Sequence, residues 1–182
     1  LSLFTAYLFA TQPIIRKVKD RFKLDRLQES DLLSVGVLVG LSLILGLVIG
    51  MISSIQLSVG REYVPSWVFL AVLASFVLVQ LQYLLLKHFR VIGMGLAFFM
   101  LISYVYLSSA IGTTATLSGL PALVKNVNLL SILEGQFAGY FDGQTAGIGV
   151  FFGLLVFFGL LAIANIFIPK KFTQTKEIES SL

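Results

Sequence analysis

Four long stretches of this sequence contain no charged side chain. They cover residues 32–60, 63–86, 91–124 and 143–169. About 20 apolar residues in a helix cross the hydrocarbon core of a bilayer, so each stretch can span a membrane. The chain of 182 residues is 57% hydrophobic and 12% charged, which leaves too little polar surface for a soluble domain of that size. The pattern therefore predicts an all-α, polytopic integral membrane domain.

Breaks in these stretches set the ends of five predicted transmembrane helices. The stretch 91–124 is too long for one span, and the Gly, Thr, Ser and Pro residues after position 110 end its helix there. At the start, the apolar run that ends at Pro13 is short of a full span by about a turn, and no Met begins it. We therefore expect a fragment of a longer protein, truncated within its first span. The predicted spans are residues 1–14, 32–56, 64–86, 91–110 and 145–168.

Residues 13–30 separate the first two predicted spans and are strongly basic. Ile15, Val18 and Phe22 recur at spacings of three and four, which places them on one face of a helix. A basic amphipathic helix between two apolar runs is typical of a segment that lies on the cytoplasmic membrane surface; a solvated loop is the alternative, with the same topology. The residues expected to contact the membrane surface are Arg16, Lys17, Lys19, Arg21, Lys23 and Arg26.

The distribution of basic residues predicts the orientation of the chain. With residues 13–30 inside, eleven of the thirteen basic residues lie on the cytoplasmic side, and only Arg61 and Lys125 lie outside. This arrangement follows the positive-inside rule. It predicts a multi-pass protein of the cell membrane, with the N-terminal end of this sequence outside and a cytoplasmic tail at residues 169–182.

An outer segment, residues 115–142, is mostly apolar but unsuited to span the membrane. Pro121 and Gly135 interrupt it, and Lys125 and Glu134 would be costly at bilayer depth. We expect a re-entrant or interfacial helical pair, and we regard Lys125 and Glu134 as its candidate functional residues. One helical face of the segment would carry Leu130, Leu133, Phe137 and Tyr140.

Small and polar residues within the predicted spans suggest contacts between helices. Six glycines form small-xxx-small pairs that allow close packing in lipid, within the chain or between chains; the alternative is that Gly is simply common in membrane helices. These glycines are Gly36, Gly40, Gly46, Gly50, Gly149 and Gly153. Gln80, Gln82 and Asn165 are expected to make interhelical hydrogen bonds rather than to contact a substrate.

The ends of the span at 64–86 also carry informative residues. Tyr63 and Trp67 are predicted to be interfacial anchors at its outer end. Lys87, His88 and Arg90 are expected to lie in the cytoplasmic loop that closes its inner end.

The sequence offers little to support catalysis. No Asp, Glu, Lys or Arg falls in the middle of a predicted span, so no proton relay is visible. There is one His and no Cys, which excludes thiolate metal sites and the usual metal-binding clusters. Basic residues at membrane edges do not form a nucleic-acid surface. We expect no enzymatic activity, no cofactor and no nucleic-acid partner; the bilayer itself is the expected environment.

Three pieces of the sequence resemble the C-terminal membrane region of the EsaA/YueB proteins. They are FTAYLF at residues 4–9, VIGMGLAFFML at 91–101 and NLLSILEGQFAGYFDGQTAGIG at 128–149. Those proteins are accessory membrane components of the type VII secretion system of Gram-positive bacteria. The resemblance implies a longer parent with a large extracellular domain. It also implies a component that helps to form or scaffold an export apparatus, as a homo-oligomer or together with other secretion-system membrane subunits.

The layout is also similar to the wider YhgE/Pip and ABC-2 membrane domains. In those domains a cytoplasmic amphipathic helix follows the second span of six, and an outer re-entrant segment precedes the last span. Residues 13–30 and 115–142 occupy those places here. This similarity implies an alternative function, an exporter permease that works with a separate ATPase contacting residues 13–30. The sequence has no Walker motif of its own.

Overall fold

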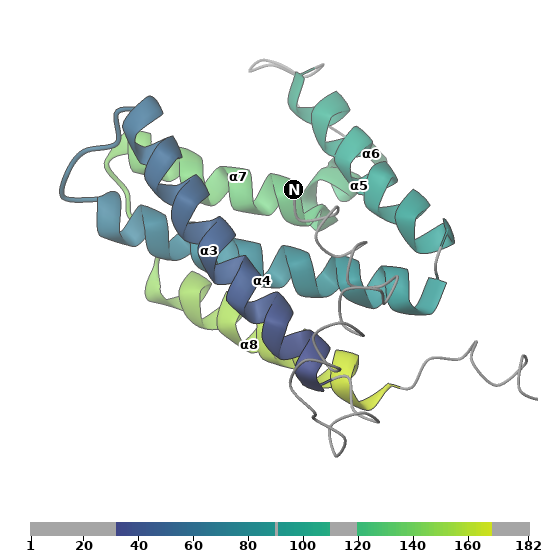
Figure 1. Ribbon diagram of the computed structural model, residues 1–182. Coiled ribbons are helices and arrows are strands. Elements are labelled where there is room, and N and C mark those ends of the chain that lie inside the picture. Colours follow the sequence, from purple (N-terminus) through teal and green to yellow (C-terminus); the bar gives the residue numbers. More distant parts are fainter. Residues whose placement is uncertain (1–31, 90, 110–119, 169–182) are drawn as a thin grey trace, which may run out of the picture.

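The computed structural model describes residues 32–89, 91–109 and 120–168, and every regular element in these ranges is a helix (Figure 1). The all-α prediction is therefore confirmed. The elements are α3 (Leu32–Gln56), α4 (Val64–Phe89), α5 (Val91–Ser109), α6 (Leu120–Val127), α7 (Leu129–Gly139), the short 3-10 helix η2 (Tyr140–Asp142) and α8 (Ile148–Phe167).

Three helices of the described chain are long and apolar enough to cross a membrane. They are Ser34–Gln56 within α3, Val64–Phe89 (α4) and Ile148–Phe167 (α8). The apolar part of α5, Val91–Tyr106, is shorter. The predicted span at residues 1–14, the amphipathic helix at 13–30 with its six basic residues, and the tail at 169–182 all lie outside the described residues. Five spans therefore stay a prediction.

Helix α4 is the centre of the bundle. It packs against α3, α5 and α8, and Figure 1 shows α3 crossing it, with α7 above it and α8 below it in that view. Buried side chains run along α4 from Trp67 to Lys87. By contrast, α3 and α8 leave many large apolar side chains exposed, among them Ile44 and Phe152. In lipid such surfaces are stable, since hydrocarbon is their solvent.

The α3–α4 interface depends on two of the predicted packing glycines. A Cβ added to Gly46 would lie 2.5 Å from Val72 Cα, and one added to Gly50 would lie 3.1 Å from Val68 Cα. The two helices therefore approach closely where side chains are absent, as small-residue packing in lipid requires.

The other four predicted glycines face no described neighbour. An added Cβ would meet nothing within 4 Å at Gly36, Gly40, Gly149 or Gly153. Contact between chains at these positions stays a prediction. At the turn from α4 to α5, Gly93 is the more constrained residue, because its Cβ would collide with the main-chain carbonyl of Leu85.

Candidate functional site

Asn128 joins α6 to α7 and fastens this helical pair to α5. Its backbone is extended and its side chain accepts a hydrogen bond from Leu130 N at 3.0 Å, so it caps the start of α7. The same side chain donates from Nδ2 to Met100 O at 2.9 Å and to Ser103 Oγ at 3.0 Å. Asn128 is buried. These contacts place the α6–α7 junction against the middle of α5.

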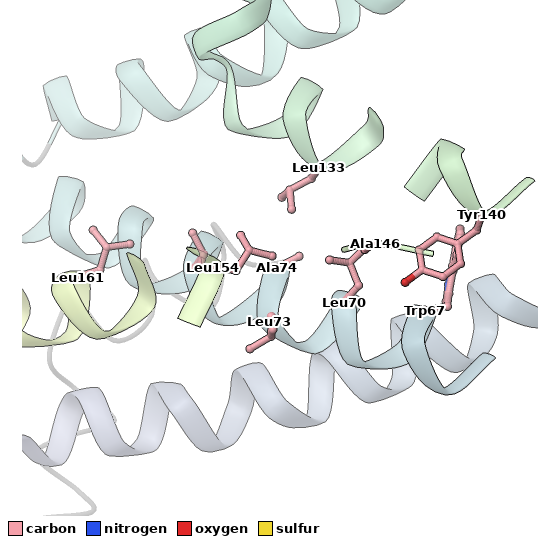
Figure 2. Close-up of a cluster of buried hydrophobic side chains, with 10 residues drawn as sticks. Trp67, Leu70, Leu73, Ala74, Leu133, Tyr140, Ala146, Leu154 and Leu161 are labelled. Carbon is pink, nitrogen blue, oxygen red and sulfur yellow. The ribbon is translucent and has the colours of Figure 1, made fainter. Parts of the chain in front are cut away.

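From that junction, α7 runs back to the first turns of α4. The face predicted for residues 130, 133, 137 and 140 is the face that packs. Leu133 and Tyr140 are buried in the main core (Figure 2). Phe137 packs against this core. Leu130 is half-buried.

Trp67 is the anchor of this contact on α4. Its ring centroid lies 4.7 Å from that of Phe137, 5.5 Å from Tyr140 and 5.8 Å from Phe141, all edge to face. Such pairs each add to the energy of apolar burial. The indole Nε1 donates to Ser53 Oγ of α3 at 2.9 Å. Trp67 is only 3% exposed, so its prediction as an interfacial anchor is wrong: protein rings, not headgroups, surround it.

Hydroxyl groups complete this cluster at the N-terminal end of α4. Tyr140 OH and Ser66 Oγ are 2.6 Å apart and share a hydrogen bond. The ring of Tyr63 meets the ring of Tyr140 edge to face at 6.2 Å. The pKa of Tyr63, in the turn before α4, is raised because the neighbouring Glu62 carboxylate disfavours the phenolate and accepts its hydrogen bond.

A second polar cluster joins the C-terminal half of α4 to α8. Asn165 Nδ2 donates to Gln80 Oε1 at 2.8 Å and to Gln80 O at 3.0 Å, and both residues are fully buried. The predicted interhelical hydrogen bonding is confirmed for these two residues. Gln82 is half-buried, and its Oε1 has no hydrogen-bond partner in the described part of the chain.

Lys87 belongs to this cluster around Gln80 and Asn165 rather than to a loop. Helix α4 continues through it to Phe89, and its ammonium donates to Asn165 O at 2.6 Å while 6% exposed. Side chains on a helix lean toward its N-terminus, which directs Nζ back along α4. The carbonyl it meets lies in the last turn of α8, where carbonyls lack intrahelical donors and carry the negative end of the helix dipole.

The sequence signal for Lys87 was its spacing. It follows Gln80 by seven residues, which is two turns on one helical face. The interpretation of Lys87 as a charge that ends a span does not take this shared face with Gln80 into account.

Lys125 and Glu134, the candidate functional residues predicted for the segment 115–142, lie on exposed faces of α6 and α7. Arg61 is exposed in the turn between α3 and α4. Among the described residues, no group of three His, Cys, Asp or Glu side chains could hold a metal ion.

Comparisons with known proteins agree with the helical architecture. The family model described as the EsaA helical domain matches residues 1–166. No curated protein matches the chain, and no solved structure does. Because the family match covers most of the sequence, this chain belongs to the EsaA helical domain family.

Proposed function

We propose that this chain is a membrane-embedded component of a type VII protein secretion machine and helps to form or scaffold its export apparatus. Membership of the EsaA helical domain family suggests a component associated with that system. Three helices suited to span a membrane support a place within the bilayer. In this role the chain is a structural subunit without catalytic activity, and it assembles with further copies or with other secretion subunits.

The proposed topology puts the α3–α4 turn on the outer side, lets the α6–α7 pair enter the bundle from that side and return to it, and puts the α4–α5 turn and the C-terminal tail on the cytoplasmic side. It rests on the distribution of basic residues. The order of the helices supports it. If α3, α4, α5 and α8 cross the membrane in alternating directions, α5 ends on the side where α8 begins. The α6–α7 pair between them must therefore start and finish on that same side.

The observation that carries the functional proposal is the packing of α7 on α4. An outer segment that merely covered the surface would need no deep contact with a spanning helix. Here Phe137 and Tyr140 surround Trp67, and Leu133 is buried in the main core. The pair is thus built into the bundle, at the end where exported protein would leave.

Secretion of a type VII substrate tests this role. Phe137→Ala removes the ring that lies closest to Trp67 and should reduce the substrate in the culture medium, at unchanged abundance of the protein. The matched control is Phe152→Ala, since Phe152 on α8 is 68% exposed and lies outside that contact. Normal secretion by the Phe137 variant, with α7 shown to be displaced, would refute a role for this packing in export.

A second candidate is an ABC-2-type exporter permease that works with a separate ATPase. The place of the α6–α7 pair directly before the last spanning helix favours it. This function predicts efflux of a small or lipid-like compound that stops when the partner ATPase is lost. Intact type VII secretion in cells that lack the protein would favour the permease over the secretion component.

A further inference from the structure

The α6–α7 junction reaches roughly the middle of the bilayer in the proposed topology. The side chain of Asn128 donates a hydrogen bond to the carbonyl of Met100, the central residue of α5. A second estimate comes from α7, whose 11 residues extend for about 16 Å. That helix begins after Asn128 and ends at Tyr140, which is bonded to Ser66 at the outer end of α4. Half of a hydrocarbon core is about 15 Å, so the two estimates agree.

Polar side chains are exposed close to this deep junction. Lys125 and Asn126 precede Asn128 by three and two residues, and both are exposed. Lys125 leans toward the start of α6 and so toward the outer side, which lessens the cost of its charge in lipid. The side chain of Asn126 is too short to extend toward the outer side in this way. In hydrocarbon its amide would lack hydrogen-bond partners, which is unfavourable.

The neighbouring helix shows what a lipid-facing surface looks like at the same depth. On α5, Phe99 and Ile102 are each 63% exposed and wholly apolar. Helices α3, α4, α5 and α8 do not separate a polar face from an apolar one, whereas α6 does. Amphipathic character of this kind indicates two different surroundings for the two faces.

We propose that the polar face of α6, formed by Lys125 and Asn126, borders a water-filled vestibule that opens to the outer side and extends to about the middle of the membrane. Water is the occupant, because it satisfies both the ammonium and the amide. The inference rests on the proposed topology, but it does not require that the exported substrate be a protein.

Cysteine labelling tests the vestibule, and the sequence contains no cysteine of its own. Single cysteines are introduced at Asn126 and Lys125 of the full-length protein, in a background without other accessible thiols. Intact cells are treated with a charged, membrane-impermeant methanethiosulfonate. The thiolate is the reactive form and requires water. We expect Asn126→Cys and Lys125→Cys to react within about tenfold of the rate of Gly60→Cys in the outer turn, and Ile102→Cys to react at least about a hundredfold more slowly.

The outcomes separate this inference from the proposed function. If both α6 cysteines react as slowly as Ile102→Cys while Gly60→Cys reacts, the face meets lipid and the vestibule is refuted. Labelling in purified protein but not in cells would show that a partner subunit covers the face, and would also refute it. If Gly60→Cys reacts only after permeabilisation, the proposed orientation fails instead. The two α6 positions serve as independent tests, so loss of one variant through misfolding leaves the other.

Discussion

The two ends of α4 hold their neighbours by different chemistry. At its N-terminal end, the outer end in the proposed topology, aromatic rings from α7 and η2 surround Trp67, and two side-chain hydrogen bonds join α3, α4 and η2. At its C-terminal end, the inner end in the proposed topology, an amide pair and a lysine ammonium join α4 to α8. The first arrangement is mainly apolar and would weaken gradually as rings are trimmed. The second contains a buried charge, whose loss or reversal leaves partners unsatisfied.

Reversal of the charge at the inner end should have the largest effect. Lys87→Glu would bring a carboxylate against the carbonyl of Asn165, at the negative end of the α8 dipole. We expect a loss of about 3–5 kcal/mol in the free energy of unfolding, measured in detergent by SDS-induced unfolding. Lys125→Glu makes the same charge change on an exposed face and should have a much smaller effect. Equal losses for the two variants would mean that the hydrogen bond from Lys87 to Asn165 O makes no specific contribution to the free energy of unfolding.

A bulky residue at Gly46 should be nearly as damaging, and it tests whether the two ends are independent. Gly46→Ile would force α3 away from Val72, at a cost of about 3 kcal/mol. Because Ser53 is on α3, the bond to Trp67 at the outer end should weaken, whereas the bond between Lys87 and α8 should persist. Cysteine cross-linking of each helix pair measures the two separately. Gly40→Ile is the matched control, since its position faces open space in the described chain. A stable Gly46 variant with α3 in place would contradict the close contact.

For the buried amides of Gln80 and Asn165, removal of one partner should cost more stability than removal of both. Asn165→Leu leaves Gln80 Oε1 without its donor and should cost about 2 kcal/mol of stability. The double variant with Gln80→Leu should recover part of that loss, because both polar groups are then gone. A double-mutant cycle of unfolding free energies gives the coupling. Additive losses would show that the two amides do not interact.

Removal of one hydroxyl at the outer end should have the smallest effect. Tyr140→Phe keeps the ring against Trp67 and loses only the bond to Ser66, at about 1 kcal/mol. Hydrogen exchange should rise in α7 and η2 but not in α8. Ser66→Ala should reproduce the change, and the two substitutions together should add little. Faster exchange in α8 would show that the two ends of α4 are coupled.

Several features of the fold and the candidate site could be predicted from the sequence. The helical class follows from uncharged stretches of spanning length. The α7 face of Leu133, Phe137 and Tyr140 follows from helical periodicity. That Gln80 and Asn165 each hydrogen-bond to another helix follows from the cost of leaving an amide unpaired between apolar helices, although the sequence does not say that they pair with each other.

Other features could not be predicted, because they depend on how the helices are rotated and placed. Trp67 has the position of an interfacial anchor in the sequence, but α7 covers it. In the sequence Lys87 has the position of a charge at the end of a span, but in the fold it donates a hydrogen bond to the Asn165 carbonyl of α8. Asn128 carried no signal of its own, since its bonds to α5 join residues 25 and 28 positions apart.

The sequence by itself determined which segments are helical and apolar, because hydropathy and periodicity are local properties of neighbouring residues. It also determined where charges are concentrated, and hence the predicted orientation in a membrane. Only the tertiary structure decided which of the six glycines meets another helix, and which polar groups meet each other. In an apolar bundle every face of a helix is similarly hydrophobic, so the pattern does not specify its rotation. Close backbone packing at Gly46 and Gly50, and a few hydrogen bonds between helices, select it.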